Sequence, residues 1–229
     1  MFDAERAAAT ERLQEVRALY QLVTAQESEL DPRQPEPDQL LVLRGLFFVL
    51  LYAYFESSVN RFVSATLNHV SGAAILTKHL QVALYSLALN PTLTALESSG
   101  KNTKWRHRVA LFADQDSSDR CAINDVVLSI YLQNIWHASL LQVFSCLGIR
   151  EQVVPSNRHI GYVDELVDKR NAIAHGREAA ADVGRRFRSS ELLVRLDAVA
   201  EVVAHLEASL TTYLDQKLYI ADSHRAAYP

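Results

Sequence analysis

Glycine and proline are scarce in this sequence. Its 229 residues include only 7 glycines and 6 prolines, which leaves few positions for the tight turns that join many short strands. A turn-rich β protein is therefore disfavoured. Hydrophobic residues make up 49% of the chain, enough for the core of one large or two small helical domains, and the fold class that we expect is all-α.

Cysteine is almost absent. The two cysteines, Cys121 and Cys146, match neither a disulfide framework nor a Cys-x-x-Cys metal site, so we expect reduced thiols and a cytoplasmic protein. The sequence also lacks His-x-x-His, His-Glu-x-x-His and any Cys/His cluster, the usual arrangements of zinc ligands. Acidic clusters with metal-binding spacing are missing too, which disfavours a two-metal nuclease. We expect no metal and no other cofactor.

Other signatures are missing as well. The chain has no glycine-rich phosphate loop and no Gly-x-Ser-x-Gly nucleophile elbow, which disfavours the enzyme classes that depend on them. Its formal net charge is −4, which argues against a protein that coats nucleic acid but permits a local basic site.

A membrane-spanning or secretory segment is not expected. The first 19 residues are charged and amphipathic and lack the apolar stretch of a secretory signal. The most apolar run, Leu40 to Phe55, is short for a membrane span and contains Arg44 and Gly45. We interpret it as a buried helix, and we expect no membrane partner.

The apolar periodicity predicts a helical chain. Helices are expected over residues 4–30, 39–69, 122–147, 161–177 and 190–220, with one or two more over 71–97. We expect one domain over 1–229, made of an N-terminal helix and proline-rich loop (1–36), a core bundle (37–221) and a frayed tail (222–229). The last helix carries apolar residues at alternating spacings of four and three, which could pack inside the protomer or against a second copy: Leu192, Leu196, Val199, Val203, Leu206, Leu210 and Tyr213.

The stretch 161–177 combines an apolar face with charged and polar groups. As one helix it places Arg170 in the middle of a face formed by Val163, Leu166, Val167, Ile173 and Ala174. A polar stripe of Asp164, Asp168, Asn171 and His175 follows one edge of the same helix. A guanidinium keeps its charge and is costly to desolvate alone. Arg170 therefore needs a carboxylate, a phosphate or a wet interface.

Two structural interpretations of this stretch stay open. Arg170 could be part of a buried ion pair, and His175 with Gly176 could simply end the helix. A partner for Arg170 is offered by Glu56, which sits in an apolar face of the 39–69 helix. The two side chains could face each other, so that Glu56 orients the guanidinium. Alternatively, Glu56 faces solvent or pairs with Arg61.

The string Arg170-Asn171-x-x-x-His175 resembles the Arg-x4-His signature of the HEPN superfamily. The lead-in Val163-Asp164-Glu165-Leu166-Val167 and the ending Ala174-His175-Gly176 resemble its RiboL-PSP-HEPN branch. The resemblance is strongest over residues 127–176. It implies an antiparallel helical bundle with extra helices, dimerising through the motif face so that two motifs form one cleft. Many members of the superfamily are metal-independent ribonucleases of bacterial toxin and defence systems.

The motif residues fit metal-free RNA cleavage. That reaction uses the ribose 2′-OH as nucleophile and needs proton transfer and a cation beside the phosphate. Arg170 supplies bidentate contact to phosphate, and His175 moves protons. Asn171 would hold the imidazole or a phosphate oxygen, with Asp168 in support. The expected product carries a 2′,3′-cyclic phosphate.

Two basic runs are candidate RNA contacts. Lys104 and Arg106 flank Trp105, which could stack a base, or they begin a solvated helix with the tryptophan packed inward. Arg177, Arg185 and Arg186 follow the motif and form either a positive rim or a solvated turn.

One position departs from the resemblance. HEPN toxins that are neutralised by nucleotide transfer usually carry a tyrosine two residues after the histidine, and Arg177 stands there in this chain. We therefore expect a different antitoxin, a second HEPN subunit or a defence-system sensor protein as partner. The leading hypothesis is a homodimeric endoribonuclease of a toxin–antitoxin or antiphage system. The alternative is a non-catalytic HEPN subunit that binds RNA, a nucleotide or a partner protein.

Overall fold

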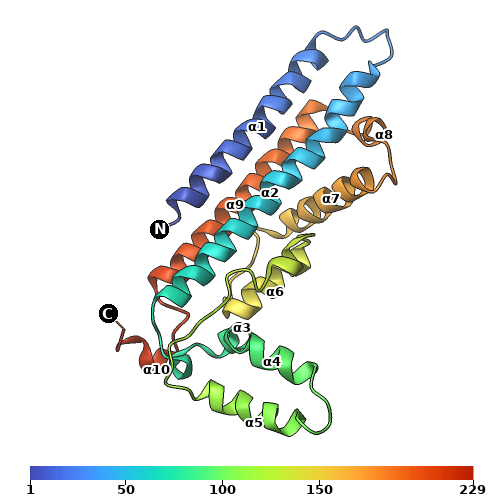
Figure 1. The fold of residues 1–229 in the computed structure, drawn as a ribbon. Coiled ribbons are helices and arrows are strands. Elements are labelled where there is room, and N and C mark those ends of the chain that lie inside the picture. The colour runs from blue at the N-terminus through green and yellow to red at the C-terminus, as the bar shows by residue number, and fades with distance from the viewer. Residues whose placement is uncertain (229) are drawn as a thin grey trace.

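A computed structural model describes residues 1–228, and helices dominate it (Figure 1). The described part of the chain contains no β-strand, only two isolated β-bridges, so the predicted all-α class is confirmed. The α-helices are α1 (Asp3–Ser28), α2 (Asp38–Gly72), α3 (Tyr85–Ala88), α4 (Asn90–Glu97), α5 (Lys104–Gln115), α6 (His137–Leu147), α7 (Asn157–Ala174), α8 (Ala180–Gly184), α9 (Ser189–Asp215) and α10 (Asp222–Arg225). The 3₁₀ helices are η1 (Thr77–His79), η2 (Val82–Leu84) and η3 (Ser129–Leu132).

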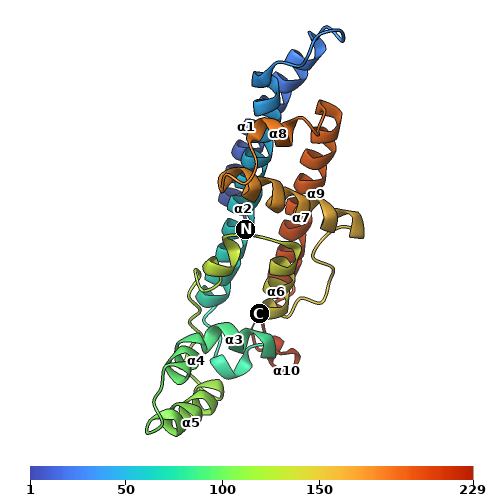
Figure 2. The same cartoon turned by 90° about the vertical axis from the view of Figure 1, so that its right-hand side faces the viewer.

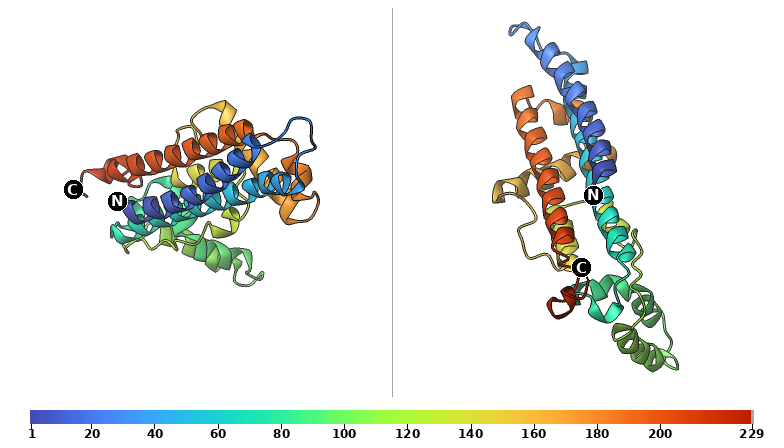
Figure 3. Two further views of the ribbon diagram at one scale, coloured as in Figure 1. Left: turned by 90° about the horizontal axis from the view of Figure 1, so that it is seen from above. Right: turned by 90° about the vertical axis from the view of Figure 1, so that its left-hand side faces the viewer.

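Helix α2 is the centre of the molecule. Helices α1 and α9 run along it, and α7 and α8 also pack on it (Figures 1 and 3). Its first half is apolar nearly all round, as a helix with neighbours on several sides must be. By length and composition α2 could cross a membrane, but more than half of its apolar stretch is buried inside the bundle, which is how the core helix of a helical bundle behaves.

The apolar seam of α9 packs inside the protomer. All seven of its residues are buried against the core, which decides between the two arrangements that the sequence left open. The helix itself ends at Asp215, five residues before the predicted end, and Lys217 takes a positive φ of 51°.

A buried arginine ties the start of the bundle together. The Arg44 side chain is fully buried and contacts Glu27 Oε1 at 2.7 Å and Glu36 Oε1 at 2.9 Å. The other oxygen of Glu27 accepts the Ser189 N–H at 2.8 Å, at the start of α9. Arg188 also pairs with both carboxylates. This set of four charges, the Arg44 network, joins α1, the proline-rich loop, α2 and α9. The sequence shows Arg44 inside its most apolar run but does not identify its partners.

Two glycines set the distance between α2 and α8. A Cβ on Gly45 would lie 2.0 Å from the Ala180 carbonyl oxygen, and one on Gly184 would lie 1.9 Å from that of Leu41. Only hydrogen fits at either position, so the two backbones touch. The stretch between the end of α7 and α9 is thereby held against α2.

The predicted helix over 122–147 is wrong in its first half. Residues 122–136 form irregular chain with the short η3, and α6 begins only at His137. Side chains of α2 supply the hydrogen bonds that a helix would have made. Asn60 Nδ2 donates to the Leu132 carbonyl (3.1 Å), and Ser64 Oγ donates to that of Asp125 (3.1 Å). We call residues 122–136 the crossing segment.

Helices α4 and α5 form a hairpin that projects from one end of the molecule (Figures 1 and 2). On α5, Trp105, Val109 and Phe112 lie at helical spacing and are about 70% exposed. The Arg108 guanidinium carbon lies 4.7 Å above the Trp105 ring. The tryptophan therefore points outward, and the interpretation that packs it inward is wrong.

The predicted frayed tail is ordered over 222–228. Residues Asp222–Arg225 form α10. The Tyr228 hydroxyl lies 2.8 Å from His79 Nδ1 and accepts the Leu76 N–H at 3.1 Å. These contacts hold the tail against η1. The last residue of the predicted tail, Pro229, lies outside the described residues.

Candidate functional site

Helix α7 presents the motif as the sequence predicts. Val163, Leu166 and Val167 are buried in the core, and the helix ends at Ala174. His175 is its C-terminal cap, and Gly176 follows in the left-handed region with a φ of 67°, where glycine is the favoured residue. The interpretation that His175 and Gly176 end the helix is therefore confirmed, and the helix stops three residues before the predicted bound at residue 177. Ala174 differs from the prediction, because it is exposed while Ala172 is buried.

Arg170 is held by neutral groups. Its guanidinium carbon lies 4.5 Å above the ring of Tyr52. Its Nη1 donates to Asn171 Oδ1 at 2.8 Å and, more weakly, to Asn134 Oδ1 at 3.3 Å. Within residues 1–228 it forms no ion pair, so the structural ion-pair interpretation is wrong. An aromatic ring and amide oxygens orient the cation without cancelling its charge, which leaves that charge for an anion such as phosphate.

Glu56 does not face Arg170 directly. The Tyr52 hydroxyl donates to Glu56 Oε1 at 2.9 Å, so the tyrosine stands between the carboxylate and the guanidinium. Glu56 makes no ion pair with Arg61 either, among the residues described. Both proposed pairings of Glu56 are therefore wrong. Its carboxylate supports the ring on which Arg170 lies.

Tyr52 is the hub of this arrangement. It is 1% exposed, and its hydroxyl also accepts the Ile135 N–H at 3.1 Å and lies 3.1 Å from the Gln133 carbonyl oxygen. Burial and the adjacent Glu56 carboxylate raise the pKa of the phenol, so it stays protonated and keeps donating. The tyrosine thus joins the crossing segment to the place where Arg170 lies.

His175 stands at the surface. It is exposed, and its imidazole has no hydrogen-bond partner in the described part of the chain. The side-chain oxygen of Asn171 is engaged by Arg170 rather than by the imidazole, and the amide nitrogen of Asn171 points to no protein acceptor among residues 1–228. Asp168 pairs with Lys169 at 3.0 Å and with Arg177 at 3.8 Å. Asn171 therefore orients Arg170 rather than the imidazole, and Asp168 forms ion pairs with the neighbouring cations.

The predicted basic contacts divide into two groups. Arg177, Arg185 and Arg186 follow the motif in sequence, but each pairs with a carboxylate, that of Asp168, Asp182 and Glu178 respectively. All three are at least half exposed. Lys104 and Arg106 lie on α5, at the opposite end of the bundle from α8 (Figure 1). The structure therefore does not bring the two groups together around the motif.

Two residues of the site escaped the sequence analysis. Tyr52 was not among the predicted site residues, although it stands four residues before Glu56 on one helix, a spacing that allows their contact. Asn134 carried no signal, because it fell inside the helix wrongly predicted over 122–147. Within residues 1–228, no group of three or more histidine, cysteine or acidic side chains is placed to hold a metal ion.

The comparisons with known proteins give one match. The family model described as RiboL-PSP-HEPN matches residues 8–207, from within α1 to within α9. No curated protein and no solved structure matches the chain.

Proposed function

The chain belongs to the RiboL-PSP-HEPN family, and we propose that it is a metal-independent endoribonuclease. The family gives the coarse expectation of a nuclease or an RNA-related function. One observation carries the finer proposal: Arg170 keeps an unpaired positive charge in a fixed orientation, with the exposed His175 five residues further along the chain. An arginine with a purely structural role in this position would instead form an ion pair with a carboxylate.

The proposed reaction uses the RNA as its own nucleophile. The 2′-oxygen attacks phosphorus, the bond from phosphorus to the 5′-oxygen breaks, and the products are a 2′,3′-cyclic phosphate and a 5′-hydroxyl. Arg170 contacts the non-bridging oxygens and stabilises the charge that grows on them. A histidine takes the 2′ proton and another group protonates the leaving 5′-oxygen. The Tyr52 ring and the oxygens of Asn171 and Asn134 keep the guanidinium aimed.

A second copy of the chain would complete this chemistry. The reaction needs a base and an acid, and one protomer brings one exposed motif histidine. We propose a homodimer in which His175 of the partner subunit supplies the other proton-transfer group. The proposed setting is a toxin–antitoxin or antiphage system in the cytoplasm. Arg177 stands where HEPN toxins that are neutralised by nucleotide transfer usually carry a tyrosine, so the proposed partner is an antitoxin of another kind or a sensor protein.

The decisive experiment is cleavage of total RNA and tRNA in EDTA by the wild type, Arg170→Ala and His175→Ala. His107→Ala is the matched control, because this histidine lies on α5. We expect wild type and control to leave cyclic phosphate ends, and both motif variants to lose about 10²-fold or more in rate while keeping their circular dichroism. Cleavage that survives in both motif variants would contradict the proposal.

The alternative is a non-catalytic subunit that binds RNA, a nucleotide or a partner protein. It is favoured by the carboxylate partners of Arg177, Arg185 and Arg186, which reduce the positive field around the motif. It predicts that His175→Ala leaves binding intact and that no RNA is cleaved by the wild type, even with a dimer present.

A further inference from the structure

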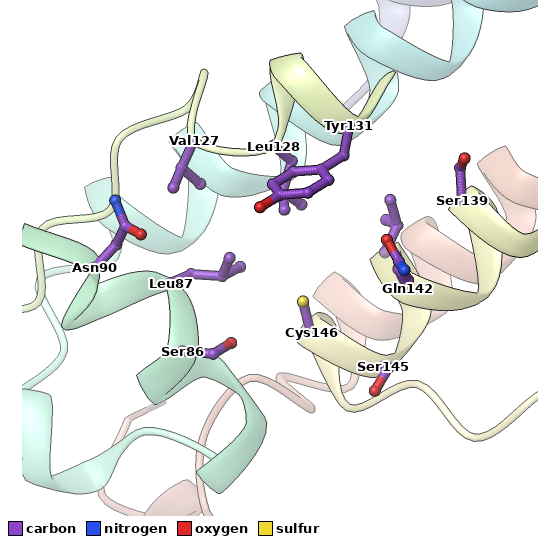
Figure 4. Close-up of a pocket in the computed structure, with 11 residues that line it drawn as sticks. Ser86, Leu87, Asn90, Val127, Leu128, Tyr131, Ser139, Gln142, Ser145 and Cys146 are labelled. Atoms are coloured by element: carbon purple, nitrogen blue, oxygen red, sulfur yellow. The ribbon is translucent and has the colours of Figure 1, made fainter. Parts of the chain in front are cut away.

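A cavity of about 400 Å³ opens between the start of the α3–α4 region, the crossing segment and α6 (Figure 4). Its size falls within the usual range of small-ligand pockets, about 300–1,000 Å³. The lining residues come from all three of these parts: Ser86, Leu87, Asn90, Val127, Leu128, Tyr131, Ser139, Gln142, Val143, Ser145 and Cys146.

No charged side chain lines this cavity. A phosphate inside it would lose its hydration without gaining a counter-charge, which is costly. Aliphatic side chains form much of the wall, and the polar groups are neutral. In Figure 4, Tyr131, Gln142 and Cys146 reach toward the common space from two different elements. Such a lining suits a flat, uncharged ligand with polar edges.

A nucleobase has these properties. Unpaired RNA bases are typically bound by stacking on aromatic rings and by hydrogen bonds to their edges. Tyr131 is 62% exposed and presents such a ring. Asparagine and glutamine amides offer a donor and an acceptor together, the pattern that pairs with a base edge, and Asn90 and Gln142 provide two of them.

The cavity lies close to the motif in the fold. Tyr131 is three residues before Asn134, which contacts Arg170, and a chain of that length spans at most about 11 Å. On the far side, α6 carries Gln142 and begins at His137, whose N–H donates to Asp164 Oδ1 on α7 at 3.0 Å. A base in the cavity would thus belong to a nucleotide close to the phosphate held by Arg170.

We propose that this cavity, the base pocket, binds an unpaired nucleobase of the RNA substrate beside the cleaved bond. Tyr131 contacts the face of the base, and the amides of Asn90 and Gln142 contact its edge. The inference rests on the proposed function and adds a source of sequence preference to it.

The two cysteines provide a direct test. Cys146 lines the base pocket and is partly exposed, whereas Cys121 is buried, and burial raises the pKa of its thiol to about 11. Alkylation of the folded protein therefore reports Cys146. We expect 2′-O-methyl oligonucleotides, which cannot be cleaved by 2′-OH attack, to slow this alkylation by about tenfold when bound. An oligonucleotide of equal length that is abasic throughout should give no protection.

Fluorescence anisotropy on the same samples measures oligonucleotide binding. It tests the proposed base pocket separately from the proposed ribonuclease function. Oligonucleotide binding without protection of Cys146 would overturn the base pocket and leave the ribonuclease proposal standing. Absence of any RNA binding would overturn both.

Base preference gives the second readout. Gln142→Leu keeps the size of the side chain and removes its amide. We therefore expect the ratio of cleavage rates between preferred and other bases to fall by at least about tenfold. Leu141→Ala is the control, because Leu141 is 49% exposed on the same helix and does not line the pocket. An unchanged site ranking in a folded Gln142→Leu protein would count against the proposal.

Discussion

At the scale of single residues, Tyr52 joins three parts of the site. Its ring lies below Arg170, its hydroxyl donates to Glu56, and the same oxygen accepts the Ile135 N–H of the crossing segment. The ring and the hydroxyl therefore have separable roles. One orients the cation, and the other holds the surrounding chain.

Two substitutions distinguish these roles. Tyr52→Phe keeps the ring but leaves Glu56 and the Ile135 N–H without their partner, so we expect a loss of about 1–3 kcal/mol in stability and cleavage within a few fold of wild type. Tyr52→Leu also removes the ring below Arg170 and should lower the cleavage rate about tenfold more. Denaturant unfolding and initial rates measure both effects. Equal losses of activity in the two variants would show that the ring does not orient Arg170.

Arg170 itself gives a second prediction. It forms no ion pair in the described chain, so Arg170→Ala leaves no buried carboxylate unpaired and should cost no more than about 1.5 kcal/mol. Arg170→Lys keeps the charge but loses the planar fork, and we expect cleavage to fall about 10²-fold. A loss of stability above about 3 kcal/mol in Arg170→Ala would instead indicate a structural arginine.

How far these residues were predictable follows from what periodicity encodes. Spacing along one helix placed Val163, Leu166 and Val167 on a shared buried face with Arg170, and the structure agrees. It contains no information on which faces of different helices meet. A direct contact between Glu56 and Arg170 was therefore one of the arrangements left open, although Tyr52 stands between them. Asn134 approaches from a distant, irregular part of the chain.

At the scale of elements, the Arg44 network makes the bundle sensitive to acid. Hydrogen bonding to Arg44, with further help from Arg188, lowers the pKa of Glu36. A carboxyl whose folded pKa lies below its unfolded value, about 4.3 for glutamate, contributes stability above that pH and loses it as the pH falls below it. The junction of α1, the proline-rich loop and α9 should loosen first under acid.

Arg44→Met tests this. Removing the buried guanidinium takes away one of the two cations that pair with Glu27 and Glu36 and leaves them only the half-exposed Arg188 of the network. Because these carboxylates are only 17% and 20% exposed, we expect a loss of about 3 kcal/mol at pH 7. The variant should also lose less stability than wild type between pH 6 and about 3.5. Unfolding curves across this range measure both quantities. If the variant lost as much stability at low pH as the wild type does, the Arg44 network would be excluded as the source of the acid sensitivity.

Glycine positions give another prediction at this scale. Gly184→Ala would place its Cβ 1.9 Å from the Leu41 carbonyl oxygen, so α8 must move away from α2. We expect a loss of at least about 2 kcal/mol and weaker cleavage. Gly161→Ala is the matched control: it lies in α7, where an added Cβ meets nothing within 4 Å, and should stabilise the helix by about 0.5–1 kcal/mol. Thermal unfolding of the two variants should therefore shift in opposite directions.

The long helices were predictable and the crossing segment was not. Helices α1, α2, α7 and α9 have strong apolar periodicity, and their observed bounds lie close to the predicted ones except at a few ends. The 122–136 stretch carries packing residues at helical spacing too, but Tyr52, Asn60 and Ser64 of α2 take over its backbone hydrogen bonds. That competition is tertiary and is not visible in the local sequence.

At the scale of the whole molecule, the proposed homodimer makes activity depend on concentration. If both motifs form one cleft, dilution below the dimer dissociation constant should lower the specific activity. The loss should be reversed on reconcentration. Cleavage per chain that stays constant while light scattering shows a change from dimer to monomer would show that one protomer is sufficient.

The central helix also has a hydrodynamic consequence. With 35 residues, α2 is about 50 Å long, and the α4–α5 hairpin extends the molecule further beyond one of its ends (Figure 1). A 25.7 kDa protomer of this shape has a large frictional ratio and travels through a gel-filtration column ahead of compact proteins of equal mass. Side-by-side association would double the mass with little gain in length, so the dimer would sediment faster while its frictional ratio falls.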